Sequence, residues 1–294
     1  MKSLSIFFHD SKPISQLVGL AFLFLLGFIL ATGLQILCPL GYDSPAAIRM
    51  ALVMQCISQL FIFCLPALLF VALYKGHAAT YIQLDFHRRK WLLAAVAMVI
   101  FFLLVPINDW VTWWNDRWNL GSLDAQLRSI SDASKTTIAK MLSLTSVGDL
   151  LLQIFVVALI PAVCEELFFR GALQKILRQW FGNAHMAIVV TAILFSVAHG
   201  DIFGLVPRFL LGLLLGYLFF LSGSLLVNVC AHFFNNALIV VLYHFYNKGM
   251  IAANPDTPLQ LPWHITLLCT LAAAALFVLY FLSKDKKTPQ KKSI

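Results

Sequence analysis

The only two glutamates of the chain are neighbours, Glu165 and Glu166, and they lie in an otherwise apolar run. An ionisable group in the hydrocarbon layer of a membrane is costly, so it is by default a candidate for a functional role. Arg170 follows four residues after Glu166, which on a helix predicts an ion pair on one face. Glu165 is turned away from that face by about 100°. A carboxylate without a partner of its own is suited to act as a general base.

A histidine ends the next apolar run, at His199. The turn between the two runs centres near Gly182, and Glu165 and His199 lie equally far from it along the chain. In an antiparallel helical hairpin these two side chains reach the same depth. The spacing therefore predicts that Glu165 and His199 approach each other.

A polar stripe crosses a later apolar run, because Asn228, His232 and Asn236 follow one another at spacings of four. Hydrogen bonding between helices would explain an asparagine stripe. A histidine at its centre favours a functional site instead.

Together these side chains could activate water. Glu165 would take a proton from water bound by His199, while His232 and Asn236 would stabilise an oxyanion, which amounts to hydrolysis of an amide or ester. Glu165, His199 and His232 could equally supply the three protein ligands of a catalytic zinc ion. The residues leave the zinc and the metal-free versions open. The sequence contains neither GxSxG nor HExxH, which argues against a serine elbow and a standard zincin.

Three motifs resemble those of one protease family. Cys-Glu-Glu-Leu-Phe-Phe-Arg-Gly at 164–171 is similar to an EExxxR motif, Phe-Ser-Val-Ala-His at 195–199 to FxxxH, and His232 with Asn236 to HxxxN. In this order they resemble the CAAX prenyl protease 2 / bacteriocin-processing (CPBP, or ABI) family of intramembrane proteases. The resemblance covers residues 148–246.

The resemblance implies an eight-helix intramembrane endopeptidase, whose prenyl-processing branch removes three residues after a lipidated cysteine. By motif match, Glu165 is the base, His199 helps to hold the water, and His232 and Asn236 form the oxyanion side. The residues implied in supporting roles are Glu166, Arg170 and Phe195.

Composition indicates what must position these residues. The hydrophobic fraction is 61%, and charged residues make up only 12%, whereas a soluble domain carries roughly 25% charged residues. The mean hydropathy is +0.86. An ordinary soluble enzyme is thereby excluded, and we predict an all-α, polytopic transmembrane helical bundle with about eight membrane-spanning helices. The predicted spans are 15–38, 51–74, 91–107, 148–168, 184–199, 206–222, 224–246 and 262–282.

The net charge is +8, and the basic residues are clustered. Basic loops stay in the cytoplasm and meet anionic lipid, so we expect both termini to be cytoplasmic and expect no nucleic-acid partner. The basic residues on the expected cytoplasmic side are Lys75, Arg88, Arg89, Lys90, Arg170, Lys175, Arg178, Lys284, Lys286, Lys287, Lys291 and Lys292.

We expect three parts in the chain. Residues 1–147 would form three membrane helices and a tryptophan-rich interfacial loop, 148–246 the catalytic helical core, and 247–294 the last membrane helix with a basic tail. Within the first part, residues 124–142 have a weak amphipathic pattern that suits a helix on the membrane surface.

The expected partners are membrane lipids and a membrane-associated peptide or protein substrate, either plain or prenylated. Two other functions stay open from sequence alone. One is a non-enzymatic immunity or scaffold protein of the same fold, and the other is a proton-coupled transporter.

Overall fold

The computed structural model describes residues 11–38, 41–74, 81–84 and 87–285, with side chains as far as Tyr280. These residues form an all-helical bundle in which seven helical stretches are long and apolar enough to cross a membrane. An eighth apolar helix, α10, is shorter. The prediction of an all-α transmembrane bundle is confirmed. The chain termini, which were predicted to be cytoplasmic, lie outside the described residues.

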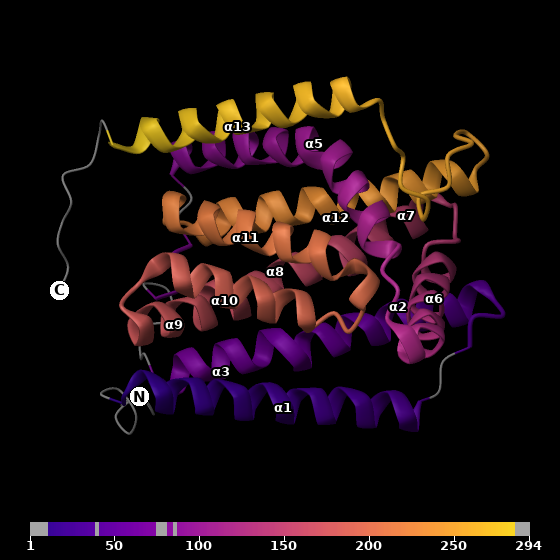
Figure 1. The fold of residues 1–294 in the computed structure, drawn as a ribbon. Helices are drawn as coiled ribbons and strands as arrows, with labels where there is room; N and C mark the ends of the chain where they lie inside the picture. Colours follow the sequence, from indigo (N-terminus) through magenta and orange to yellow (C-terminus); the bar gives the residue numbers. More distant parts are fainter. Residues whose placement is uncertain (1–10, 39–40, 75–80, 85–86, 286–294) are drawn as a thin grey trace.

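The bundle begins with α1 and ends with α13, and most of its helices run roughly parallel or antiparallel to one another (Figure 1). Three of the long stretches are interrupted by π-helical segments or are joined from several pieces. The elements in chain order are α1 (Pro13–Leu37), α2 (Pro45–Gln59), η2 (Leu60–Cys64), α3 (Leu65–Tyr74), α5 (Arg88–Asp116), η3 (Gly121–Leu123), α6 (Asp124–Met141), α7 (Val147–Gln153), η4 (Ile154–Leu159), α8 (Ile160–Glu166), η5 (Leu167–Leu173), α9 (Gln174–Phe181), α10 (Ala184–Val197), η6 (Ile202–Gly204), α11 (Leu205–Ser222), α12 (Leu225–Asn247) and α13 (Trp263–Asp285).

The helices stack in layers. α13 packs on α5, α5 packs on α11 and α12, α12 packs on the α8 region, and α1 packs on α3 and η2 at the opposite edge. The stretch from α7 to α9 is therefore central, with neighbours on both sides. This position explains why its polar residues are shielded from lipid.

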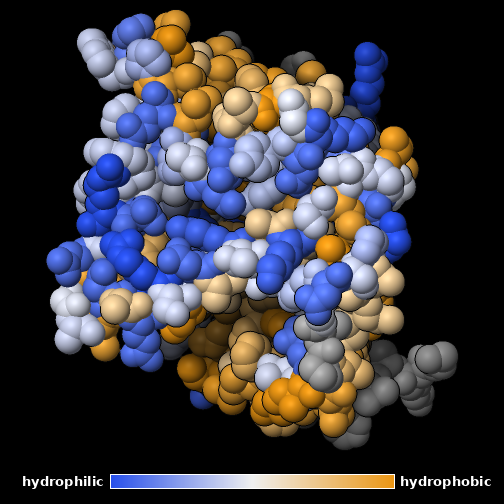
Figure 2. Space-filling model, turned by 90° about the vertical axis from the view of Figure 1, so that its right-hand side faces the viewer, coloured by the Kyte–Doolittle hydropathy of each residue, from blue (hydrophilic) through white to orange (hydrophobic). Residues whose placement is uncertain are grey.

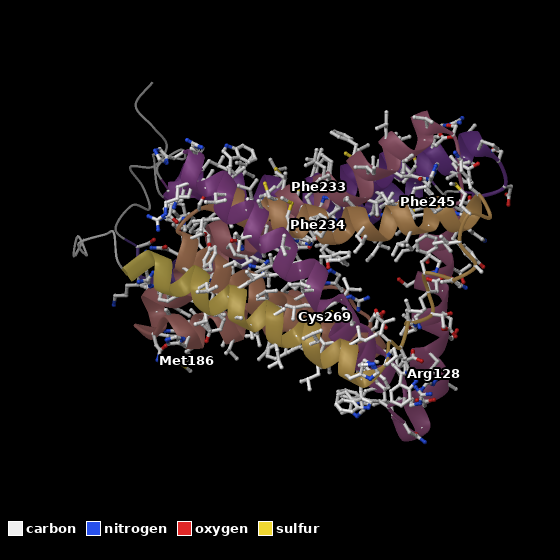
Figure 3. All side chains as sticks on the ribbon, turned by 90° about the horizontal axis from the view of Figure 1, so that it is seen from above. Arg128, Met186, Phe233, Phe234, Phe245 and Cys269 are labelled. Carbon is white, nitrogen blue, oxygen red and sulfur yellow. The ribbon has the colours of Figure 1, made fainter. Side chains whose placement is uncertain are left out.

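The two ends of the bundle differ. α1 begins and α13 ends at one end, where α9 also turns into α10 at Gly182, whose φ of +63° suits glycine. α6 lies at the other end, which we call the α6 end, and runs across the direction of the long helices (Figure 1). Seen from above, Met186 and Arg128 mark these opposite ends (Figure 3).

The third span is longer than predicted. The sequence predicted 91–107, but α5 continues to Asp116 and includes three of the tryptophans of the expected loop. A span predicted from hydropathy stops at the last apolar residues. The helix continues to Asp116 because its polar end is packed against other parts of the chain. Asn115 is fully buried, donates to the Ile202 carbonyl at 3.1 Å and accepts from the Val206 amide at 2.9 Å. The amphipathic helix predicted at 124–142 is present as α6.

Two glycines on α11 allow close packing against α10, and their carbonyls accept hydrogen bonds from side chains of η5 and α9. A Cβ atom on Gly212 would lie 3.0 Å from the Ala192 Cα atom. The Gly212 carbonyl accepts from Arg170 at 3.0 Å, and the Gly216 carbonyl accepts from Gln174 at 3.2 Å. The pair thus brings helix backbones together, as small residues do at helix interfaces in membranes.

We expect Gly212→Ala to be less stable than the matched control Gly33→Ala by about 1–3 kcal/mol, because overpacking forces the neighbouring helix to move. Gly33 also lies within a helix, and nothing lies within 4 Å of its added Cβ atom. Thermal unfolding in detergent measures both variants. Equal midpoints would show that α10 and α11 tolerate the extra methyl group.

Candidate active site

Glu166 is the centre of a buried ion network. Its Oε1 atom accepts from the Arg170 Nη1 atom at 2.6 Å and from the His232 Nδ1 atom at 3.0 Å. Its Oε2 atom accepts from the Asn228 amide at 3.1 Å. The Glu166 and Arg170 side chains are both 0% exposed. The ion pair predicted from their spacing is confirmed, and it belongs to a network that also fixes α12.

Arg170 links this network to two further helices. Besides Glu166, its guanidinium bonds the Gly212 carbonyl on α11 and lies over the Phe195 ring, 4.9 Å from the centroid. Phe195 is itself fully buried and contacts the rings of His199 and His232, at centroid distances of 4.9 and 5.9 Å. Phe195 therefore lies between Arg170 of the ion network and His199, and it packs against both.

Glu165 faces a different environment from its neighbour, as the helical turn between adjacent residues requires. Its Oε1 atom accepts from the Gln59 amide at 3.4 Å, and its Oε2 atom lies 3.8 Å from the His232 Nε2 atom. The Oε2 atom is buried and has no hydrogen-bond partner. Glu165 thus keeps a lone acceptor next to the imidazole of His232.

His199 and His232 each use the Nδ1 atom of the ring for a hydrogen bond within the protein. Because Glu166 and the Phe195 carbonyl can only accept, the Nδ1 atoms of His232 and His199 donate to them, at 3.0 and 2.8 Å. The Nε2 atoms are left for other partners. No hydrogen bond joins Glu165 to His199 in the described part of the chain; both instead line one cavity.

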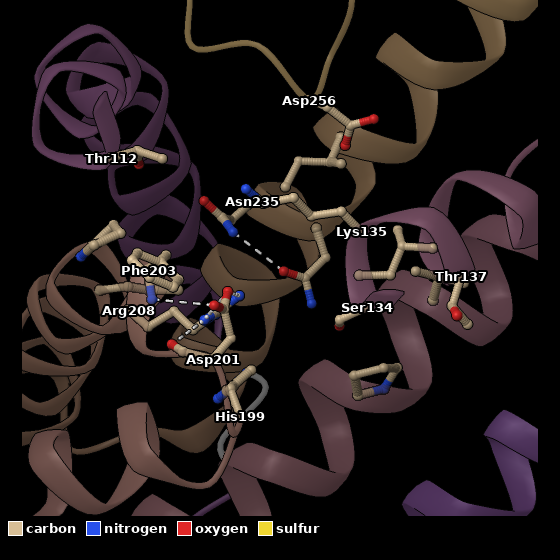
Figure 4. Close-up of a pocket in the computed structure, with 18 of the residues that line it drawn as sticks. Thr112, Ser134, Lys135, Thr137, His199, Asp201, Phe203, Arg208, Asn235 and Asp256 are labelled. Atoms are coloured by element: carbon tan, nitrogen blue, oxygen red, sulfur yellow. Dashed lines mark hydrogen bonds and ion pairs between the residues drawn. The ribbon is translucent and has the colours of Figure 1, made fainter. Parts of the chain in front are cut away.

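Asn236 also lines this cavity, and its orientation is set by its neighbour. The Asn235 amide donates to the Asn236 Oδ1 atom at 3.2 Å (Figure 4). With its oxygen occupied, Asn236 has its NH₂ group available as a donor.

The cavity has a volume of about 870 Å³. It extends from Glu165 to α6, where Ser134 and Lys135 form part of its wall (Figure 4). This size is typical of a ligand-binding site. Its polar wall residues include Gln55, Gln59, Asn108, Thr112, Asp116, Ser134, Lys135, Thr137, Glu165, His199, Asp201, Arg208, His232, Asn235, Asn236 and Asp256.

An ion pair lies beside His199 on the wall. Arg208 donates from Nη1 and Nη2 to the Asp201 carboxylate, each at 3.0 Å. Burial alone would raise the pKa of Asp201, but the nearby Arg208 charge, together with hydrogen bonds, holds this pKa below its usual value. Asp201 is therefore a charged, paired wall residue.

The structure brings the sequence-predicted residues into two connected groups. Glu165, His199, His232, Asn236 and Phe195 line the cavity, whereas Glu166 and Arg170 support it from behind. Sequence reasoning missed Gln59 and Asn235. Gln59 gave no signal because its contact with Glu165 joins residues far apart in the chain, whereas Asn235 was visible next to Asn236 but lies off the stripe.

The zinc hypothesis stays a prediction. Among the described residues, no three His, Cys, Asp or Glu side chains are grouped so that they could hold a metal ion. In particular, His232 already uses its Nδ1 atom on Glu166, and its Nε2 atom faces the Glu165 Oε2 atom.

Comparison with protein-family models gives a match over about a third of the chain. Residues 147–238 match the model of the family described as type II CAAX prenyl endopeptidase Rce1-like. Neither the curated proteins nor the solved structures contain a significant match to the chain. The matched segment carries Glu165, His199, His232 and Asn236 and is similar to the Rce1-like CAAX endopeptidases of the CPBP family, as its motifs indicated.

Proposed function

We propose that this protein is an intramembrane endopeptidase that hydrolyses a peptide bond of a membrane-associated polypeptide. The observation that carries the proposal is the different environment of two adjacent carboxylates. Glu166 is fully occupied by Arg170, His232 and Asn228, whereas Glu165 keeps an unpaired oxygen beside the cavity. The family match adds support because the matched family is one of endopeptidases.

In the proposed reaction, Glu165 takes a proton from a water molecule held beside the His199 Nε2 atom. The resulting hydroxide attacks the carbonyl carbon of the substrate, and the carbonyl oxygen becomes an oxyanion. The Asn236 NH₂ group donates to that oxygen, and His232 does so in its doubly protonated form, in which both ring nitrogens are donors. Glu165 then returns its proton to the leaving amine, the C–N bond breaks, and both products are released.

Glu166 and Arg170 act indirectly in this scheme. Their buried pair fixes the ring of His232 through its Nδ1 atom and, through Arg170, holds Phe195 against His199. They are positioning residues, because neither lines the cavity.

Glu165→Gln is expected to lower peptide cleavage by about 10²-fold or more, because the amide cannot accept the proton of water. Its thermal stability should change little, since Glu165 is outside the buried ion pair. The assay uses purified protein in detergent with plain and lipidated peptides. Full activity in this variant would contradict the proposal and favour a scaffold role, whereas substrate-dependent proton flux without cleavage would favour a transporter.

The adjacent variant Glu166→Gln provides the matched control for stability. Removing one partner of a buried ion pair leaves the other charge uncompensated and costs about 3–5 kcal/mol. We therefore expect a lower unfolding midpoint for Glu166→Gln and an unchanged one for Glu165→Gln. If the two variants unfolded alike, the division of labour between the glutamates would be wrong.

Metal analysis decides between the two versions of the chemistry. For the glutamate-base version we expect cleavage to persist after dialysis against a chelator, with far less than one zinc ion bound per chain. About one zinc ion per chain, together with activity lost on chelation and restored by zinc, would instead support the ligand set Glu165, His199 and His232.

A further inference from the structure

The cavity opens toward one end of the bundle only. Some residues of the cavity wall lie near an end of the bundle. They belong to the last turns of α5, to α6, to η6 and its flanking residues, and to the segment before α13. All of these lie toward the α6 end (Figure 1). Of the described residues at the other end, such as the turn at Gly182, none lines the cavity.

The chain segments that adjoin the end of the bundle away from α6 are rich in lysine and arginine. Helix α1 begins there, α3 ends there, α5 begins there, α9 turns into α10 there, and α13 ends there. By sequence, the segments that precede, follow or join these helix ends contain the basic residues Lys2, Lys12, Lys75, Arg88, Arg89, Lys90, Lys175, Arg178, Lys284, Lys286, Lys287, Lys291 and Lys292 and the acidic residues Asp10, Asp85 and Asp285.

The α6 end has no such excess, because its cations are matched by aspartates. Four of its basic side chains are held in ion pairs with carboxylates: Arg49 with Asp149, Arg128 with Asp124, Lys135 with Asp116, and Arg208 with Asp201. This end is nevertheless polar, and hydrophilic residues gather over much of it (Figure 2).

Short loops rich in lysine and arginine stay in the cytoplasm. The end away from α6 is then the cytoplasmic one, and the α6 end lies on the opposite side of the membrane. Given the proposed function, on which this step rests, we infer that the active site is loaded from the side of the membrane away from the cytoplasm. Its substrate class is a polypeptide segment displayed on that surface, not a cytoplasmic CAAX tail.

The depth of the site sets a requirement for this substrate. From Val147, the first residue of α7, the chain rises about 27 Å to Glu165 at the helical rise per residue. An extended chain covers about 3.3 Å per residue, so roughly eight residues must enter unfolded. The substrate is therefore a flexible segment, such as the tail of an exported peptide or the residues next to a membrane anchor.

Cysteine labelling tests the orientation without relying on proteolysis. Ser134→Cys places a thiol on the exposed α6 wall of the cavity, and Gln179→Cys places one on an exposed position of α9 at the other end. Both are made in a full-length chain whose six natural cysteines are replaced by alanine. A membrane-impermeant maleimide is added to intact cells and to opened membranes. C-terminal fusions to alkaline phosphatase and to green fluorescent protein provide an independent measurement if the cysteine-free chain fails to fold.

We expect S134C to react in intact cells and Q179C to react only after the membranes are opened. The phosphatase fusion should be inactive and the fluorescent fusion bright. The reverse pattern in either measurement overturns the inference and leaves the proposed protease standing. A further outcome is the expected labelling pattern together with no cleavage of any plain or lipidated peptide by the unmodified protein. That result supports the orientation and counts against the proposed function.

Discussion

The arrangement of the site depends on how one buried carboxylate is neutralised. Glu166 has no exposure to solvent, and its charge is tolerable only because Arg170, His232 and Asn228 all donate to it. These donors come from its own helical stretch and from α12, while Arg170 also reaches α11. The need to neutralise the buried charge of Glu166 therefore fixes the relative positions of the helices that form the cavity. Moving α12 away would leave the Glu166 charge short of donors in an apolar surrounding.

This constraint also explains how two chemically identical neighbours acquire different roles. On one helix, adjacent residues point about 100° apart, so a network that surrounds Glu166 cannot also surround Glu165. Glu165 is left with a long hydrogen bond to Gln59 and an unpaired oxygen. The difference needs no special chemistry at Glu165, since it follows from helix geometry and from which face meets α12.

Local spacing predicted the parts of the site that depend on one helix. The Glu166–Arg170 pair and the stripe Asn228, His232 and Asn236 follow from positions four residues apart, and the apolar runs followed from composition. The hydrogen bond between His232 and Glu166 could not be predicted from spacing, because it depends on how α12 packs on the α8 region. Gln59 was missed for the same reason, and the end of α5 was missed because buried polar contacts of Asn115 extend it beyond its apolar residues.

The proposed catalytic residues lie inside the segment that matches the family model, whereas several residues of the cavity wall lie outside it. Residues 147–238 supply the proposed base, the histidines and the asparagines, whereas Gln59, the end of α5 and the second half of α6 line the cavity and lie before that segment. A substrate that approaches from the α6 end meets these walls before it reaches Glu165. Under the proposed function, these walls contribute to substrate selection, whereas the groups around the water belong to the segment 147–238.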